Sequence, residues 1–396
     1  CWGPDTSGAL GDGTMAGRMS PPPVRGRAGV TDLSMGEYHT CARLMDGTVR
    51  CWGDNSRGQL GDGTSTRRMS TVAVLDVTRA THVVAGQNFS CALLTDGTVR
   101  CWGDRLHGSL GDGVSTFWSS PRVVVGLTGV AQLGVGGSHG CAVRTDATLR
   151  CWGSDDYGQL GDGVMNTSRP APVVVPGVGD VRSVAGGRDQ TCIVLRDGTV
   201  RCAGDTPIVP SGDAQDPRLA TFQPVPGITS AVEVAAARAH VCARLSSGGL
   251  GCWGDNSYGE LGDNRTGTQV TPGRVRGIES AAQVVANGYY TCARLTDDTL
   301  RCWGLNHRGQ LGDGTILDRG VPVPVAGLGE VTTMTAGDAH VCALRPGGTV
   351  RCWGDNAAGQ LGDGTRSSQF TPQDVSGLAD VADIAAMPFG RALVFS

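Results

Sequence analysis

Short apolar runs alternate with segments rich in glycine, aspartate, serine and threonine along the whole chain. In one representative stretch, this alternation predicts four strands separated by turns, at residues 83–85, 90–94, 98–102 and 122–125. The three residues 95–97 end in glycine, as in a hairpin turn whose last residue is left-handed. A long polar loop occupies residues 103–120. All-valine runs at 123–125 and 173–175 predict strands that are buried on both faces.

The same pattern recurs about every 50 residues. The tripeptide Cys-Trp-Gly or its degenerate form Cys-Ala-Gly starts units near positions 1, 51, 101, 151, 202, 252, 302 and 352. Four units continue with Gly-Gln-Leu-Gly-Asp-Gly, and Asp-Gly-Thr-Val-Arg occurs three times further on; most of the other units carry close variants of these motifs. Self-similarity on this scale is typical of an array whose units stack to share a core. We therefore expect residues 1–396 to form a single all-β domain.

The number of units predicts a closed β-propeller of eight blades, each of about 50 residues. A strand predicted at residues 392–395 ends just where another Cys-Trp-Gly would start, so we expect the N- and C-terminal strands to close one shared blade. The alternative is seven blades with one unit displaced. The unit that starts at Cys202 is the candidate, because it lacks the tryptophan and the Gly-Gln-Leu-Gly-Asp-Gly loop.

Cysteine usage points to an oxidising compartment. Fourteen of the 15 cysteines form seven pairs ten residues apart, each opposite across its hairpin: Cys41 with Cys51, Cys91 with Cys101, Cys141 with Cys151, Cys192 with Cys202, Cys242 with Cys252, Cys292 with Cys302 and Cys342 with Cys352. Opposed residues of a non-hydrogen-bonded pair lie about 4.5 Å apart, within reach of a disulfide. Packed free thiols and zinc ligands are the alternatives. We expect disulfides, an extracellular, periplasmic or cell-surface location, and an unpaired Cys1.

Composition limits the function. The net charge of -4 argues against a nucleic-acid surface, and no apolar run approaches the ~20 residues of a membrane span. Nucleophile, phosphate-loop and paired-carboxylate motifs are missing from the sequence. We therefore expect neither an enzyme nor a cofactor or metal.

Two motifs carry a family resemblance. Residues 52–61 read Trp-Gly-Asp-Asn-x-x-Gly-Gln-Leu-Gly, and residues 337–344 read Gly-x-x-His-x-Cys-Ala-Leu. Both resemble repeats of the regulator of chromosome condensation superfamily. The resemblance implies a β-propeller of four-stranded blades, and its best-known members have seven. The family includes a nucleotide exchange factor, a plant photoreceptor and secreted inhibitors of β-lactamase, and the bacterial secreted type matches the cysteine pattern best.

Repeated polar side chains have structural interpretations. His39, His139, His240 and His340 share one repeat position, where the resemblance implies a structural histidine that bonds backbone; a metal site is the alternative. Loop aspartates such as Asp62 and Asp363 predict turn caps rather than a calcium loop. The repeated arginines, among them Arg50 and Arg351, predict ion pairs to those aspartates.

The framework barely changes between units, whereas two loop segments vary. They are rich in the residue types of interface hot spots. The variable positions predicted to bind are Arg57, Arg67, Arg68, His107, Phe117, Trp118, Tyr157, Tyr258, Arg308 and Arg319. We expect a monomeric scaffold that binds an unidentified protein or surface polymer through this loop face. A carbohydrate-binding module, a hydrolase or lyase using the same face, and ordinary solvated loops are the alternatives.

Overall fold

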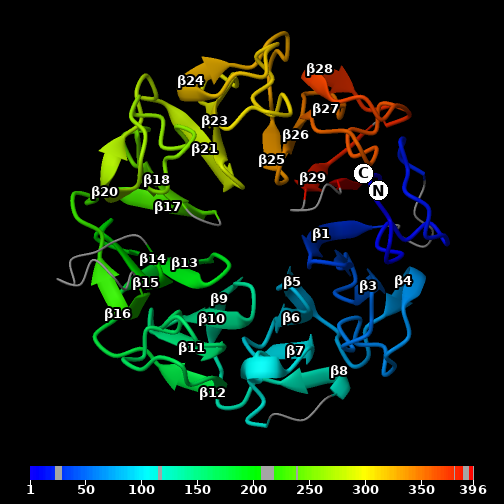
Figure 1. The fold of residues 1–396 in the computed structure, drawn as a ribbon. Helices are drawn as coiled ribbons and strands as arrows, with labels where there is room; N and C mark the ends of the chain where they lie inside the picture. Colours follow the sequence, from blue (N-terminus) through cyan, green and yellow to red (C-terminus); the bar gives the residue numbers. More distant parts are fainter. Residues whose placement is uncertain are drawn as a thin grey trace. The chain divides into compact units, whose positions relative to one another are not determined.

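The computed structural model describes residues 1–22, 29–114, 118–206, 218–237, 240–378, 380–386 and 392–395. The chain divides into two compact units. The four-blade unit comprises Ser7–Met15 and Val24–Val225, and the three-blade unit comprises Cys1–Thr6, Ala16–Pro23 and Pro226–Ser396. Each unit is described separately below, with the strand labels of Figure 1.

The four-blade unit contains four antiparallel four-stranded sheets in simple sequence order. Blade 1 consists of β1 (Val30–Met35), β2 (His39–Leu44), β3 (Val49–Gly53) and β4 (Arg68–Ala73). Blade 2 consists of β5 (Ala80–Ala85), β6 (Phe89–Leu94), β7 (Val99–Gly103) and β8 (Trp118–Val123), with a short 3-10 turn η1 (Leu106–Gly108). Blade 3 consists of β9 (Val130–Val135), β10 (His139–Arg144), β11 (Leu149–Gly153) and β12 (Arg169–Val174). Blade 4 consists of β13 (Val181–Gly186), β14 (Gln190–Leu195), β15 (Val200–Asp205) and β16 (Arg218–Pro224).

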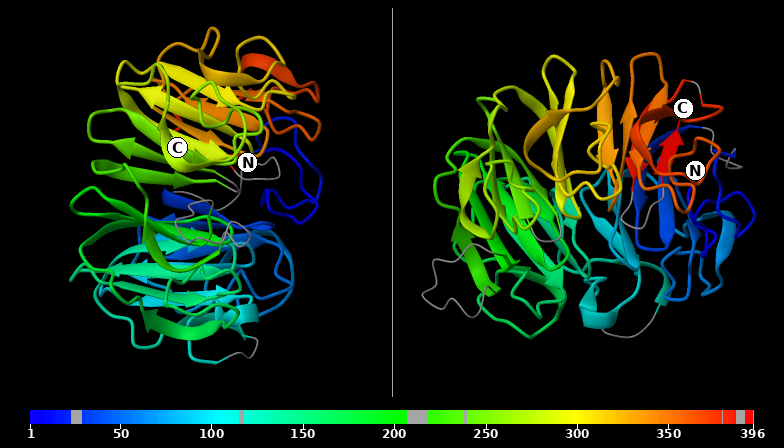
Figure 2. Two further views of the ribbon diagram at one scale, coloured as in Figure 1. Left: turned by 60° about the vertical axis from the view of Figure 1, so that its left-hand side comes forward. Right: turned by 45° about the horizontal axis from the view of Figure 1, so that its top comes forward.

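The three-blade unit repeats this arrangement and adds a smaller sheet. Blade 5 consists of β17 (Ala231–Ala236), β18 (His240–Leu245), β19 (Leu250–Gly254) and β20 (Gln269–Arg274). Blade 6 consists of β21 (Ala281–Asn287), β22 (Tyr290–Leu295), β23 (Leu300–Gly304) and β24 (Arg319–Pro324). Blade 7 consists of β25 (Thr333–Ala336), β26 (His340–Leu344), β27 (Val350–Gly354) and β28 (Gln369–Asp374). β29 (Asp383–Ala386) pairs with β30 (Ala392–Phe395) in a two-stranded sheet. Figure 2 shows the blades of this unit stacked against one another.

The fold is a seven-bladed all-β propeller, and the prediction of eight blades is wrong. A repeat counted from Cys-Trp-Gly straddles two blades: it supplies strands three and four of one sheet and strands one and two of the next. Eight sequence units therefore give seven complete four-stranded sheets, and half a unit is left over at each end of the chain. Among the described residues, β30 pairs with β29 and Gly3 forms an isolated bridge with Arg18, so the predicted shared terminal blade of four strands is not formed. The unit that starts at Cys202 is not displaced, because its strands β15 to β18 lie within blades 4 and 5.

All seven predicted disulfides are present, each between directly opposed residues of the second and third strands. Their Cα atoms lie 4.1 to 4.2 Å apart, as expected for close pairs in a hairpin. They also belong to the core between blades. Cys41 and Cys51 of blade 1 share one buried cluster with Trp102 of blade 2. Each disulfide therefore fixes its own hairpin, and the Cys41–Cys51 bridge also packs against the next blade. Cys1 is buried as well.

The degenerate repeat keeps its packing through a substitute side chain. Gly61 approaches Trp102 so closely that a Cβ atom on it would clash with the indole ring. Between blades 3 and 4, Ala203 replaces the tryptophan. The glycine equivalent to Gly61 is Gly161, and it faces the ring of Phe222 instead. Phe222 lies on β16 and is buried in the same cluster as the Cys141–Cys151 pair. A phenyl ring from the fourth strand thus fills the space that an indole from the third strand occupies elsewhere.

The valine runs do not form strands buried on both faces. Val124 is fully buried, but its neighbours Val123 and Val125 are 48% and 42% exposed. The same alternation holds at Val174, which is exposed, and Val175, which is buried. β8 ends at Val123 and β12 ends at Val174, so these valines lie at or just beyond the end of the fourth strand, which is the last of its sheet in sequence order.

Candidate functional site

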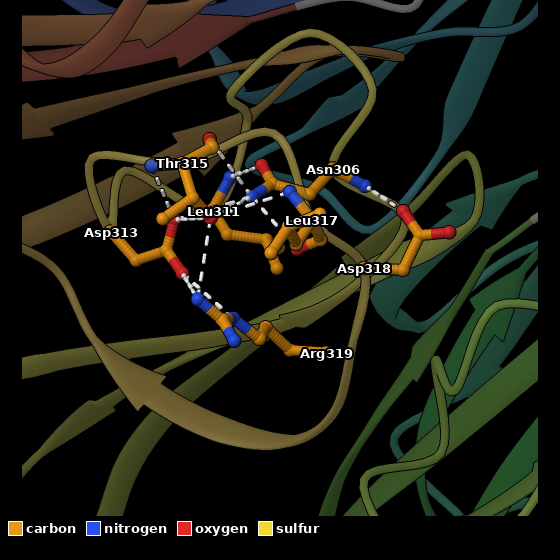
Figure 3. Close-up of polar contacts among 7 residues, drawn as sticks. All are labelled: Asn306, Leu311, Asp313, Thr315, Leu317, Asp318 and Arg319. Carbon is orange, nitrogen blue, oxygen red and sulfur yellow. Dashed lines mark hydrogen bonds and ion pairs between the residues drawn. The ribbon is translucent and has the colours of Figure 1, made fainter.

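The loops between the third and fourth strands, here called the outer loops, carry most of the variable positions. An internal clasp centred on one asparagine holds those of blades 1, 5, 6 and 7. In blade 6, Asn306 Nδ2 donates to Asp313 Oδ1 at 3.3 Å and to the carbonyl oxygens of Thr315 and Leu317, each at 3.1 Å. Its Oδ1 accepts the Leu311 N–H at 3.0 Å (Figure 3). One side chain thereby satisfies a backbone donor and several backbone acceptors of a long loop.

An aspartate–arginine pair completes the clasp. Arg319 Nε donates to Asp313 Oδ2 at 2.8 Å in blade 6 (Figure 3). Burial opposes ionisation of Asp313, but hydrogen bonds from Thr315 and Arg319 hold its pKa below the ordinary value. Equivalent pairs join Arg68 to Asp62 and Arg169 to Asp162.

These pairs change the interpretation of two predicted binding residues. Arg68 and Arg319 both bond an aspartate of their own loop, so their guanidinium groups stabilise the loop as well as facing solvent. The framework arginines behave differently from expectation. Arg351 pairs with Asp374 of β28 at 2.7 Å rather than with a loop aspartate.

The repeated histidines link neighbouring blades. The Nε2 atoms of His39, His139 and His240 lie 2.7 to 2.8 Å from hydroxyl oxygens of the next blade, those of Ser90, Thr191 and Thr291. Burial lowers the pKa of His139, His240 and His340 to about 4, so these rings are neutral at physiological pH. The role is structural, as expected, but the partner is a hydroxyl group rather than backbone.

The outer loops rest on the next blade through its tryptophan. Trp303 Nε1 donates to the Glu260 carbonyl oxygen at 2.8 Å, and Thr291 Oγ1 donates to the same oxygen at 2.9 Å. Trp353 makes the equivalent bond to Gln310 at 3.0 Å. The outer loops of blades 5 and 6 are therefore each anchored at one backbone carbonyl.

The remaining predicted residues lie on the outer loops or at the start of a fourth strand. Trp118 is 42% exposed at the start of β8, and the Arg122 guanidinium lies over its ring at 4.4 Å. Arg67 lies 3.7 Å from Asp54, and His107 lies 3.7 Å from Asp156. Three further predicted residues occupy one loop position and are exposed or partly exposed: Arg57, Tyr157 and Arg308. Phe117 lies outside the described residues.

One predicted residue is part of an aromatic cluster. The Tyr258 ring meets Tyr289 edge to face at 5.5 Å and His307 at 5.9 Å. His307 Nε2 lies 3.3 Å from Asp318, and its side chain is 63% exposed. These three rings, the Tyr258 cluster, come from two adjacent outer loops and from the turn between β21 and β22. Sequence analysis missed Tyr289 and His307; the only signal was that each adjoins a variable position.

Two buried acids replace the amides of the clasp. Asp155 stands where most loops have asparagine, and Glu260 stands where most have glutamine. Asp155 Oδ1 accepts the Leu160 N–H at 3.0 Å and Glu260 Oε2 accepts the Tyr258 N–H at 2.8 Å, while the other oxygen of each is buried without a hydrogen bond. Burial raises the pKa of both carboxyl groups to about 7. Sequence analysis missed them, although the departure from the repeat was readable.

Neither a metal-ligand cluster nor a membrane-spanning helix occurs in the part of the chain that the structure describes. Within the described ranges, no three side chains of histidine, cysteine, aspartate or glutamate converge as a metal site. No helix in the same ranges has the length and apolar character to cross a membrane.

Comparison with known proteins identifies the repeat. Two models of the regulator of chromosome condensation (RCC1) repeat match the chain. One matches residues 30–59, 80–108, 130–159, 281–310 and 331–360, and the other matches 46–93, 149–194, 297–344 and 347–387. No curated protein matches significantly.

Solved structures show the same fold. Prp20p from Saccharomyces cerevisiae superimposes with a TM-score of 0.69 at 16% identity, covering 93% of this chain and 92% of that chain. The same yeast protein bound to Kap60 gives 0.69 at 16% identity, covering 95% and 96%. Human WBSCR16 gives 0.66 at 21% identity, covering 95% and 89%.

Proposed function

Because this chain belongs to the β-propellers built from RCC1 repeats, we propose that it is a secreted or cell-surface scaffold that binds another protein through its outer loops. RCC1-like propellers commonly act as protein-binding scaffolds, and the yeast relative was crystallised with Kap60 and characterised for binding to Gsp1p and histones. The chain would act as a monomer and would not catalyse a reaction. Its partner need not resemble those of the yeast protein.

The observation that carries the proposal is a contrast between the backbone and the side chains of the outer loops. Hydrogen bonds within the loops hold the backbone, while large aromatic side chains at several variable positions are open to solvent. Tyr157 and Trp118 are 38% and 42% exposed in the four-blade unit, and the Tyr258 cluster occupies the three-blade unit. Rigidly mounted tyrosine and tryptophan side chains lose little conformational entropy on binding and dominate interface energetics.

The compartment follows from the disulfides. Seven buried bridges indicate an oxidising environment. An extracellular or envelope location is the proposal that fits this chemistry.

The test is capture of partners from culture medium and envelope extract, followed by affinity measurement with the captured protein. Wild type is compared with Trp118→Ala and Tyr258→Ala. The matched control is Met45→Ala, because Met45 is 76% exposed and lies at the opposite end of its sheet. We expect at least one loop variant to lose about tenfold or more in affinity, equivalent to about 1.4 kcal/mol, while the control does not change.

Three results would count against the proposal. Unchanged affinity in both loop variants would exclude this face as the binding surface. Binding of a glycan instead of a protein would favour the carbohydrate-binding alternative. Turnover of a substrate panel would replace the scaffold with an enzyme.

A further inference from the structure

Glu260, the buried acid that accepts a hydrogen bond from the Tyr258 N–H, bears on how the Tyr258 cluster is regulated. This inference rests on the proposed function. In blade 1, the equivalent Gln59 uses both ends of its amide. Its Oε1 accepts the Arg57 N–H at 2.8 Å, and its Nε2 donates to Asp54 Oδ2 at 2.9 Å. Gln360 in blade 7 repeats both bonds, to the Ala358 N–H at 2.9 Å and to Asp355 at 2.6 Å. The amide thus bridges the variable position and the aspartate that starts the loop.

Glu260 keeps only half of this bridge. Its Oε2 accepts the Tyr258 N–H at 2.8 Å, as the glutamine oxygen does elsewhere. Its Oε1 takes the place of the donating nitrogen, is buried and has no hydrogen bond. Asp255 occupies the position of Asp54 and is an acceptor for the Ser257 N–H and hydroxyl at 3.1 and 2.6 Å. Two carboxyl groups therefore occupy the positions that hold an amide and a carboxylate in blades 1 and 7.

The two charged groups that act most strongly on Glu260 are both negative. After burial itself, the groups that raise the pKa of Glu260 are Asp255 from its own loop and Asp318 from the next outer loop. His307 Nε2 lies 3.3 Å from Asp318. A buried pair of like charges is unfavourable unless one of them binds a proton.

We propose that Glu260 shares a proton with Asp255, and that losing this proton releases the 255–258 segment and weakens partner binding by the Tyr258 cluster. With the proton, Glu260 Oε1–H donates to Asp255 as the glutamine amide does in blades 1 and 7. Without the proton, both carboxyl groups are charged, and their repulsion displaces residues 255–258, the segment that carries Tyr258. The backbone at Glu260 itself stays in place, because Trp303 and Thr291 both bond its carbonyl oxygen. Binding is therefore stronger below neutral pH than above it.

The first test needs no partner. Carboxyl ¹³C NMR of glutamate-labelled protein follows the ionisation of Glu260, and amide exchange follows the Tyr258 N–H, between pH 5.5 and 8.5. We expect Glu260 to titrate near neutrality, and the Tyr258 amide to lose protection on the order of tenfold beyond the intrinsic pH effect. Glu260→Gln should abolish that loss. Gln360→Glu, which builds the same acid pair against Asp355, should create the loss at the Ala358 amide.

The second test uses the captured partner at the same pH values. Wild-type affinity should fall severalfold between pH 6 and pH 8.5, and Glu260→Gln should bind equally at both. His307→Gln removes the imidazole beside Asp318 as a control, and it should leave the pH dependence in place. Titration of Glu260 at its ordinary pKa, or a dependence that persists in Glu260→Gln and disappears in His307→Gln, would overturn the inference. If no partner binds at all, the proposed function fails while the NMR and exchange results still decide the proton sharing.

Discussion

Asp155→Asn should stabilise the protein, and increasingly so as the pH rises. Asp155 occupies the asparagine position of the blade 3 clasp, where Asn55 in blade 1 donates to Asp62 Oδ1 at 3.0 Å and to two carbonyl oxygens at 3.1 Å. A carboxylate cannot make those bonds. The substitution restores the donors and removes a buried acid in one step.

The magnitude follows from the pKa of Asp155. Burial is the main cause that raises it from 3.8 to about 7, with Asp162 and Asp156 adding to the rise and Arg169 opposing it. A pKa raised by folding means that the carboxyl stabilises the fold fully below its unfolded value of 3.8 and loses that contribution as the pH rises through about 7. A shift of about 3 units corresponds to about 4 kcal/mol as an upper bound, reached above pH 7.

The assay is urea unfolding with the disulfides intact, repeated at intervals from pH 4 to pH 8.5. The quantity compared is the difference between variant and wild type, in which the titration of all other groups cancels. We expect a gain of a few kcal/mol at pH 8 that shrinks to the contribution of the restored hydrogen bonds, about 1 kcal/mol, at pH 4. Asn55→Asp is the matched control and should show the opposite dependence in blade 1. A gain that is the same at every pH, or a loss at pH 8, would refute the reasoning.

Two further predictions concern the links within and between blades. Replacing both Cys292 and Cys302 with alanine should lower the unfolding free energy by up to about 3 kcal/mol, because the bridge closes a short loop in the unfolded chain. The measurement is the midpoint of urea unfolding without reductant. A midpoint equal to that of wild type would contradict this prediction. Burial, only partly offset by Asp255, lowers the pKa of His240 from its ordinary value of 6.5 to about 4. The neutral imidazole therefore stabilises the fold fully above pH 6.5, and this stabilisation is lost as the pH falls through about 4. His240→Gln, which copies Gln190 of blade 4, should flatten the acid limb of the stability profile by up to about 3 kcal/mol, and an acid limb as steep as that of wild type would argue against it.

Local sequence was sufficient to predict the hairpins and their bridges. Cys292 and Cys302 lie ten residues apart across a turn, and the register of that hairpin alone brings them together. The repeat of Cys-Trp-Gly likewise determined that similar units share a core. Interactions of this kind depend on residues close in sequence and on alternation along a strand, both of which are visible in the chain itself.

The tertiary structure decided what depends on how one unit meets the next. The number of blades could not be counted from the units, because each unit divides its four strands between two sheets and the half units at the two chain ends do not form a further four-stranded sheet within the described residues. The same division lets Phe222 replace a tryptophan from a different strand. It also brings Tyr258, Tyr289 and His307 together from three separate segments. Packing between blades joins residues that are roughly one repeat apart, and their spacing in the chain carries no signal of which side chains will meet.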